Sequence, residues 1–288
     1  MSLFRSWIFV PGNNERRLEK AKDLQADVII YDLEDAVALS EKDKAREMVR
    51  QAIGNNSEKI HFVRINDPST AYFFDDVNEL AGHGLTGIVL PKAAKREQIL
   101  FVDHLLSQME EKRNTNIGSI EIVPLIESAA GLYNAFEIAG ASERIKRLAF
   151  GAVDFTLDIN AQLTKEGTEL LFARSQLVIA SRAAGIEPPI DTVFVDIKDR
   201  EGLLRDTRLA KQLGFQGKLV VHPDQIEVVN QVFAPTAEEI EEAKVITAAF
   251  DEALSSGVAA IQVNGKLVDY PVAARAKKIV DQAKALGK

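Results

Sequence analysis

The sequence has no cysteine, no long uncharged apolar run and no excess of basic residues. The lack of cysteine among its 288 residues excludes disulfides, thiolate catalysis, zinc–thiolate sites and iron–sulfur clusters, and it fits a reducing cytosol. No window approaches the roughly 18 apolar residues that a membrane-spanning helix needs, and the first residues do not resemble a signal peptide. The formal net charge of -8 argues against nucleic acid as the main partner, because binding phosphates requires a basic face. We therefore expect a cytoplasmic protein that binds neither a membrane nor nucleic acid.

What the sequence does contain is a recurring unit, in which a short β-rich run precedes a charged stretch of helical period. Eight such runs are present, and several are almost continuously apolar, as expected of parallel strands that are covered on both faces. The runs lie at residues 7–12, 28–35, 60–66, 87–93, 120–127, 148–154, 190–196 and 218–223.

The stretches between the runs have the pattern of amphipathic helices. Residues 14–24 carry apolar side chains along one stripe and charges elsewhere. Residues 168–185 end at Gly185, a residue type that commonly follows a helix C-terminus. Eight strands alternating with helices predict a (β/α)8 barrel over residues 1–234. A doubly wound open sheet is the runner-up, and it lacks support because no G-x-G-x-x-G motif follows the first run.

The pattern changes near residue 235. Thr236 opens a capping-box pattern for a helix over 236–254. An Asn-Gly pair between alternating apolar residues predicts a β-hairpin over 259–271, and a final helix is expected over about 272–286. We therefore predict a helix–hairpin–helix extension, residues 235–288, that covers the active site of a neighbouring subunit.

In such a barrel the active site lies at the carboxyl ends of the strands, so the residues that end the runs are the candidates. Glu127 and Asp154 end the fifth and sixth runs and should be neighbours. Two adjacent carboxylates suit Mg²⁺, which takes one or two protein carboxylates and completes its octahedron with water and substrate oxygens. Gly151 and Ala152 leave room for a ligand. The alternative is that each acid caps a helix or pairs with an arginine.

Three further rim residues have candidate roles. Arg64 ends the third run and could hold a substrate carboxylate through two hydrogen bonds, or it could form a structural salt bridge with Glu34 or Asp35. These two acids end the second run, and we expect them to orient Arg64 and metal-bound water. Lys92 ends the fourth run and offers Schiff-base chemistry if desolvation lowers its pKa, although most such lysines are solvated or salt-bridged.

Several separated motifs, taken in order along the chain, resemble the citrate lyase beta-subunit family within the metal-dependent HpcH/HpaI-type aldolases. One such motif would be weak support, whereas this many in the same order is specific. They are YDLEDAV, VRIN, LPKA, PLIESAAGL, FGAVDF, GTELLFAR, GFQGK and HPDQI.

The resemblance implies a modified (β/α)8 barrel, usually a homotrimer, that cleaves or forms carbon–carbon bonds in acyl thioesters with Mg²⁺, or with Mn²⁺ in its place. The matching positions are Glu127 and Asp154 for the metal and Arg64 for a substrate carboxylate. From their place at the rim, Glu34 and Asp35 are assigned as catalytic residues that assist Arg64. The resemblance also implies a catalytic acid/base in the C-terminal segment of a neighbouring subunit. The matching residue is Asp269, which from the residues alone is a turn or N-cap acid.

The same resemblance predicts a coenzyme A thioester as substrate. Arg16, Arg17 and Lys20 form the basic cluster nearest the predicted rim, and Lys92 is a further substrate-binding candidate. Subunits of dedicated citrate lyase complexes often carry Asn where this chain has His222, so participation of an acyl-carrier protein or other citrate lyase subunits stays open.

The expected reaction is cleavage of a citryl-CoA-like β-hydroxyacyl thioester into an acyl thioester and a 2-oxo acid such as oxaloacetate. One alternative is a malyl-CoA or citramalyl-CoA lyase, synthase or thioesterase of the same family. Others are a Schiff-base aldolase that uses Lys92 and a non-catalytic subunit.

Overall fold

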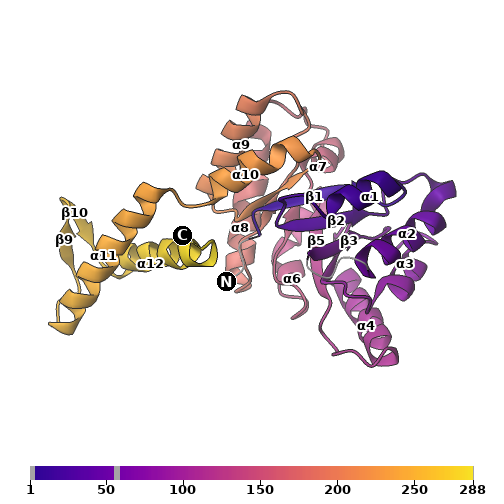
Figure 1. Cartoon of the computed structure of the whole chain (residues 1–288), viewed down its shortest axis with the longest axis horizontal. Coiled ribbons are helices and arrows are strands. Elements are labelled where there is room, and N and C mark those ends of the chain that lie inside the picture. Colours follow the sequence, from indigo (N-terminus) through magenta and orange to yellow (C-terminus); the bar gives the residue numbers. More distant parts are fainter. Residues whose placement is uncertain (1–3, 55–58, 288) are drawn as a thin grey trace. The chain divides into compact units, whose positions relative to one another are not determined.

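The strands form a closed parallel barrel. The computed structural model describes residues 4–54 and 59–287, and within them eight strands pair in sequence order while β1 also pairs with β8 (Figure 1). This closure confirms the predicted barrel and excludes the open sheet. The strands are β1 (Ser6–Pro11), β2 (Val28–Asp32), β3 (Ile60–Arg64), β4 (Gly87–Leu90), β5 (Glu121–Ile126), β6 (Ala149–Phe150), β7 (Ile190–Asp191) and β8 (Gly217–Val220).

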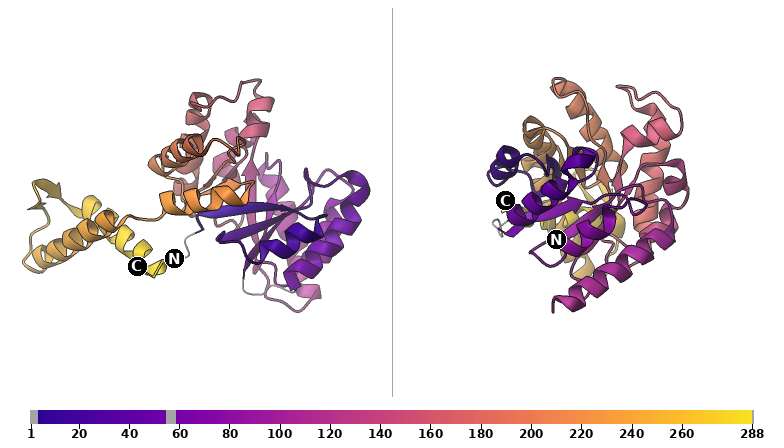
Figure 2. Two further views of the ribbon diagram at one scale, coloured as in Figure 1. Left: turned by 45° about the horizontal axis from the view of Figure 1, so that its top comes forward. Right: turned by 90° about the vertical axis from the view of Figure 1, so that its right-hand side faces the viewer.

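Helices surround the ring of strands, as the two views of Figure 2 show. Two short helices follow β5, two helices follow β6, and one α-helix follows each of the other strands of the barrel. The helices of this part are α1 (Glu15–Ala21), α2 (Lys42–Gly54), α3 (Phe73–Leu80), α4 (Arg96–Lys112), α5 (Ala129–Tyr133), α6 (Ala135–Ala139), α7 (Ala152–Asp158), α8 (Leu171–Ala183), α9 (Arg200–Leu213) and α10 (Ile226–Phe233).

Apolar side chains from the strands fill the interior of the barrel. Trp7 and Phe62 are fully buried there with ring centroids 4.8 Å apart, and full burial of one large apolar side chain stabilises a fold by about 1.5–3 kcal/mol. Leu219 belongs to the same interior cluster, so its neighbour Lys218 points outward because side chains alternate along a strand. The Lys218 ammonium accordingly contacts Asp206 of α9 at 2.6 Å.

The chain divides into two compact units, one formed by residues 4–230 and the other by the residues from 231 onward. The sequence placed this boundary between residues 234 and 235. The second unit contains α11 (Ala237–Ser255), the hairpin strands β9 (Ile261–Val263) and β10 (Lys266–Val268), and α12 (Tyr270–Ala285). The predicted helix–hairpin–helix order is therefore confirmed. The N-terminus of α11 has the expected capping box, in which Thr236 and Glu239 each accept the other's backbone N–H.

Every predicted run extends past the end of the observed strand, and the excess is largest at β6 and β7. β6 ends at Phe150 and β7 at Asp191, so Asp154 does not end a strand as predicted but lies in the first turn of α7. The backbone turns away early because helix α7 begins at Ala152, directly after Gly151. No helix within residues 4–54 and 59–287 has both the length and the apolar character needed to cross a membrane.

Candidate active site

The ion pair between Arg64 and Asp32 forms the centre of the site. These are the last residues of β3 and β2, and the parallel register pairs their Cα positions. Arg64 Nε and Nη2 donate to the two Asp32 oxygens at 2.8 and 2.6 Å, the bidentate geometry that guanidinium and carboxylate groups favour. Burial alone would lower the pKa of Arg64, but the hydrogen bonds and the charge of Asp32 outweigh this effect, so the pKa is raised overall. Arg64 therefore stays charged.

This pairing changes the role predicted for Arg64. The edge with two parallel donors, which the sequence assigned to a substrate carboxylate, is held by Asp32. Arg64 Nη1 lies 3.0 Å from Glu34 and 3.4 Å from Asp35, so the alternative of a structural salt bridge is present as well. The side chain of Asp35 is 62% exposed, whereas that of Glu34 is 8% exposed. A substrate carboxylate would therefore approach Arg64 on the Nη1 side, where Asp35 is the exposed neighbour.

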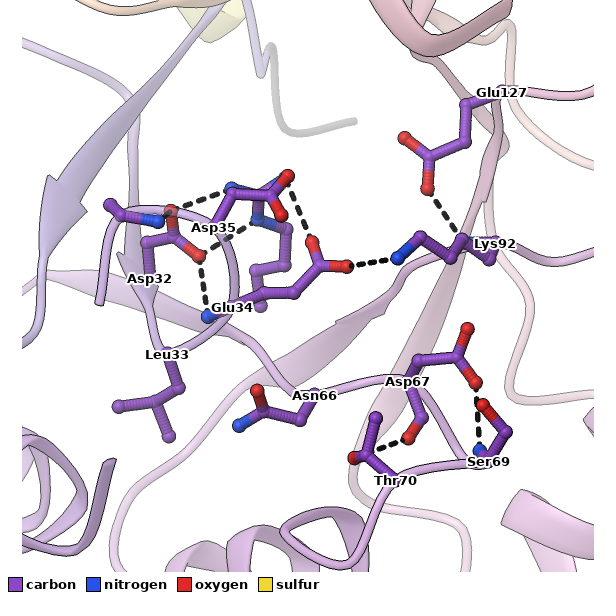
Figure 3. A network of polar contacts seen from close by, with 12 residues as sticks. Asp32, Leu33, Glu34, Asp35, Asn66, Asp67, Ser69, Thr70, Lys92 and Glu127 are labelled. Atoms are coloured by element: carbon purple, nitrogen blue, oxygen red, sulfur yellow. Dashed lines mark hydrogen bonds and ion pairs between the residues drawn. The ribbon is translucent and has the colours of Figure 1, made fainter. Parts of the chain in front are cut away.

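Glu34 connects Arg64 to Lys92. Figure 3 shows the Glu34 side chain extending toward Lys92, whose Nζ is 3.3 Å from Glu34 Oε1. Burial raises the pKa of Glu34 more strongly than the charge of Arg64 lowers it. Burial lowers the pKa of Lys92, but the charge and hydrogen bond of Glu34 raise it overall. The Schiff-base prediction required a lowered pKa, so this geometry contradicts it.

Glu127 follows β5 and is buried, and among the described residues no lysine or arginine forms an ion pair with it. Glu127 is 5% exposed. Its Oε1 accepts a hydrogen bond from the backbone N–H of Lys92 at 2.7 Å (Figure 3). Lys92 has a φ of +52°, in the left-handed region that residues other than glycine rarely adopt. Burial raises the pKa of Glu127 to about 8, and the charges of Glu34 and Asp154 add to the shift. A cation placed near Glu127 would therefore stabilise the ionised form of this carboxyl group.

Asp154 reaches this region from the first turn of α7, and its charge raises the pKa of Glu127. The backbone of Gly151 packs so closely on Glu127 that a Cβ there would lie 2.7 Å from Glu127 Oε2. Glycine is therefore required at this position. In the part of the chain that the structure describes, no three His, Asp or Glu side chains form a metal-ligand group. A cation here would use the two carboxylates and take its other ligands from water or substrate.

A cavity of about 770 Å³ opens beside these groups. Arg64, Asp32 and Asp154 contribute to its polar wall, and Arg17 and Lys20 of α1 also line it. Arg16 is not among the lining residues, so within the predicted basic cluster the cavity favours Arg17 and Lys20 as substrate-binding residues. The reason is helical periodicity, because residues one position apart point about 100° away from each other. The cavity also has apolar walls, formed among others by Phe9, Val10, Leu24, Val193 and Ile197, and His222 lies on it.

The model of the HpcH/HpaI aldolase/citrate lyase family matches residues 5–223. The chain belongs to this family. A second model, carbon–carbon bond lyase of the TIM-barrel fold, matches residues 174–288. Citrate lyase subunit beta of Leuconostoc mesenteroides subsp. cremoris is 41% identical over 98% of this chain and 94% of its own. The (3S)-malyl-CoA thioesterase of Cereibacter sphaeroides is 34% identical over 98% and 95%.

A solved structure adds a bound state of a relative. The protein CitE from Mycobacterium tuberculosis in complex with magnesium, acetoacetate and coenzyme A is 31% identical, with a TM-score of 0.79 over 97% of this chain and 98% of that chain. The resemblance inferred from the motifs is thus confirmed at the level of the family.

Asp269, which the sequence analysis predicted as an acid/base, belongs to the second compact unit. Its Oδ1 accepts the backbone N–H of Val272 at 3.3 Å, so it caps the N-terminus of α12. This is the plainer of the two alternatives that the residues alone offered. An N-cap hydrogen bond uses one carboxylate oxygen, which leaves the other oxygen available for a second role.

Sequence reasoning missed Asp32. The signal was present, because an acid at the end of the apolar run VIIYD must be buried and needs a partner. The acids that the sequence pattern suggested instead are Glu34 and Asp35, which lie beyond the end of β2. Aligning the second and third runs by length would have paired Asp32 with Arg64.

Proposed function

We propose that this protein is a Mg²⁺-dependent carbon–carbon lyase that cleaves a citryl-CoA-like β-hydroxyacyl thioester into an acyl thioester and a 2-oxo acid such as oxaloacetate. The observation that carries the proposal is the buried Glu127 carboxyl group, which forms no ion pair with a lysine or arginine among the described residues and lies close enough to Asp154 to feel its charge. Burial accordingly raises the pKa of Glu127 to about 8. The family and its lyase members support the reaction class.

The chemistry of the site fits magnesium. Glu127 and Asp154 would hold the ion, because both offer carboxylate oxygen and neither forms an ion pair with a lysine or arginine among the described residues. When bound, the ion would supply a Lewis acid next to the oxygen that gains negative charge as the carbon–carbon bond breaks. Mn²⁺ would serve as a substitute, since it accepts the same oxygen ligands.

Arg64 orients the substrate and stabilises its developing charge. Its guanidinium is fixed by Asp32 and carries a full positive charge, so it is already oriented to bind a substrate carboxylate and to stabilise negative charge that forms on a carbonyl oxygen. Glu34 keeps Arg64 and Lys92 in place through its two contacts. Asp35, which is exposed, would move aside or accept a hydrogen bond from the substrate.

Arg17 and Lys20 would bind the phosphates of coenzyme A at the cavity wall. We assign the protonation of the acyl thioester carbon to Asp269, delivered from the C-terminal unit of a neighbouring subunit in a homotrimer. We also propose that the protein acts in the cytoplasm. When it works in a complex, an acyl-carrier protein or other citrate lyase subunits would be its partners.

A second candidate is a lyase or thioesterase for malyl-CoA or citramalyl-CoA. The 34% identity to a (3S)-malyl-CoA thioesterase over nearly the whole chain supports it. In that case water would attack the thioester carbonyl after or instead of carbon–carbon cleavage.

The test is an assay of purified protein with citryl-CoA, malyl-CoA and citramalyl-CoA, with release of the 2-oxo acid and of free coenzyme A measured separately. EDTA should abolish activity, and Mg²⁺ or Mn²⁺ should restore it. Glu127→Gln should remain inactive after metal is added. Glu121→Gln is a matched control, because Glu121 begins the same strand, is partly buried and pairs with Arg147. Full activity in EDTA-treated protein would refute the proposal.

A further inference from the structure

Helix α2 presents two buried cations to the loops that flank Arg64. Lys42 and Arg46 are four residues apart and therefore lie on the same face of the helix, and they are 4% and 3% exposed. On the exposed side of the helix, Lys44 is in contact with solvent. Burying a charged side chain is unfavourable unless it is fully hydrogen-bonded, so the partners of Lys42 and Arg46 indicate what the two cations do.

Lys42 holds the loop that follows β2. Its Nζ donates to the backbone carbonyl oxygens of Leu33 and Glu34, both at 2.6 Å. The backbone N–H of Leu33 in turn donates to the carbonyl oxygen of Arg64 at 2.9 Å. A single ammonium group therefore fixes two consecutive peptide units of the segment that carries Asp32, Glu34 and Asp35. Figure 3 shows Leu33 and Glu34 in this segment beside the carboxylates.

Arg46 acts on the loop that follows β3. Its Nε donates to Asp76 Oδ1 at 2.9 Å, and Asp76 Oδ2 accepts both the backbone N–H and the side-chain amide of Asn66 at 2.9 and 2.6 Å. Asn66 lies two residues after Arg64. One turn of α2 thus holds the exit loops of β2 and β3, the two strands that carry the central ion pair.

Lys42 forms hydrogen bonds with two backbone carbonyl oxygens rather than with a carboxylate. Loss of the ammonium group would leave these buried acceptors without that donor, so the group holds the loop in its observed conformation. Its positive charge does act on Asp32, Glu34 and Asp35, since these three acids oppose the lowering of the Lys42 pKa by burial. The ammonium group therefore both shapes this acidic loop and offsets part of its charge.

We propose that Lys42 is a positioning residue of the lyase reaction, which sets the orientation of the Asp32–Asp35 segment and through it the alignment of Arg64. This role rests on the proposed function of Arg64 in binding the substrate carboxylate. The Lys42 side chain touches neither the metal position nor the cavity, so its effect is transmitted through the carbonyls of Leu33 and Glu34.

Lys42→Met tests the proposal, because it keeps side-chain length and removes the ammonium group. Lys44→Met is the matched control on the same helix. The first measurement is amide hydrogen exchange at Leu33, Glu34 and Ala36, whose N–H groups bond to Arg64 or to the Asp32 carboxylate. Exchange there should become about tenfold to a hundredfold faster in Lys42→Met, the range expected from losing hydrogen bonds to a charged group. Amides of β5 should be unchanged.

The second measurement is steady-state kinetics with citryl-CoA and Mg²⁺. A misaligned Arg64 should lower kcat/KM by about tenfold to a hundredfold, while the Mg²⁺ concentration for half-maximal activity stays near the wild-type value. If Lys42 has only a structural role, Lys42→Met should lower the thermal midpoint but leave the local exchange and the kinetic constants of the folded enzyme unchanged. That result would overturn the proposal. Lys44→Met, at an exposed position, should leave the local exchange and the kinetic constants unchanged in either case.

Restoring the charge completes the test. Because the chain has no cysteine, Lys42→Cys introduces a unique thiol, and 2-bromoethylamine applied to the unfolded variant forms a C–S bond with release of bromide. The product has an ammonium group at lysine length, and after refolding it should recover slow exchange and kcat/KM. Failure to recover either in a refolded variant would contradict the role of the charge. If the wild type cleaves no thioester, the proposed function fails, and the exchange measurement alone decides whether Lys42 orders the loop.

Discussion

Replacing Glu127 by glutamine should stabilise the metal-free protein, and the gain should depend on pH. Glutamine keeps an oxygen that accepts the Lys92 N–H but cannot ionise. In the wild type, burial raises the pKa of Glu127 from the ordinary 4.5 to about 8. A carboxyl group with a raised pKa favours the folded state when protonated and opposes folding when ionised.

The sign and size of the effect follow from the two pKa values. Below pH 4.5 the carboxyl group is protonated in both the folded and the unfolded state, so its ionisation does not affect stability. As the pH rises from 4.5 to 8, the unfolded state loses the proton first, and the free energy of unfolding decreases. The loss reaches about 3 kcal/mol at pH 7 and about 4–5 kcal/mol above pH 8, since one pKa unit corresponds to about 1.4 kcal/mol.

The assay is urea or thermal unfolding in EDTA, followed by the fluorescence of the single tryptophan. Trp7 is fully buried inside the barrel, so its signal reports on the unit that contains Glu127. For a domain of this size, about 3 kcal/mol corresponds to a rise of about 6–12 °C in the thermal midpoint of Glu127→Gln at pH 7, shrinking toward zero at pH 4.5. Mg²⁺ should stabilise the wild type and not the variant. Equal midpoints for the two proteins between pH 5 and 8.5 would refute the reasoning.

Three other outcomes follow from contacts in the barrel unit. Arg17→Glu should raise KM for a coenzyme A thioester and spare a truncated thioester, whereas Arg16→Glu should change neither, as Arg17 alone of the two lines the cavity; equal effects of both would contradict this. Borohydride added with substrate should trap no adduct on Lys92, as mass spectrometry would show. Asp191→Ala should destabilise the barrel by up to about 3–5 kcal/mol, because the buried Arg174 and Lys218 would then share Asp206 as their acidic partner, while Asp196→Ala, at a partly exposed acid, should have little effect in urea unfolding.

The order of strands and helices could be predicted from the sequence because the signal is repeated. Each apolar run begins within a few residues of an observed strand, since a strand covered on both faces must be apolar throughout. The ends were less predictable. Asp154 continues an apolar run in the sequence, yet α7 begins before it, because the choice between strand and helix at a run's end depends on the neighbouring loop rather than on hydrophobicity.

Predictions about the site succeeded where residue type sufficed and failed where contacts decide. Rim position identified Arg64 and Glu34 as candidates, and the structure brings them into contact. The predicted alternative of a salt bridge between Arg64 and Glu34 or Asp35 is present, but Asp32 was missed, because strand register and not composition places it beside Arg64. Lys92 was ambiguous because only its contact with Glu34 fixes the direction of its pKa shift. Lys42 gave no signal at all, since a lysine in a charged helix normally faces solvent.

The charges of the site divide it into two halves with different tasks. On the β2–β3 side, each acid already has a cation, since Asp32, Glu34 and Asp35 all contact Arg64 and Glu34 also contacts Lys92. Much of the acidic charge of this half is offset by these contacts, and the guanidinium fixed by Asp32 is already oriented to bind an anion. On the β5–β6 side, Glu127 has a backbone N–H as its only hydrogen-bond donor among the described residues, and Asp154 adds like charge. An uncompensated half of this kind attracts a cation, and a substrate with a carboxylate and a neighbouring oxygen can bridge the two. In the proposed lyase reaction both halves would act on the substrate, one by binding its carboxylate and the other by holding the cation.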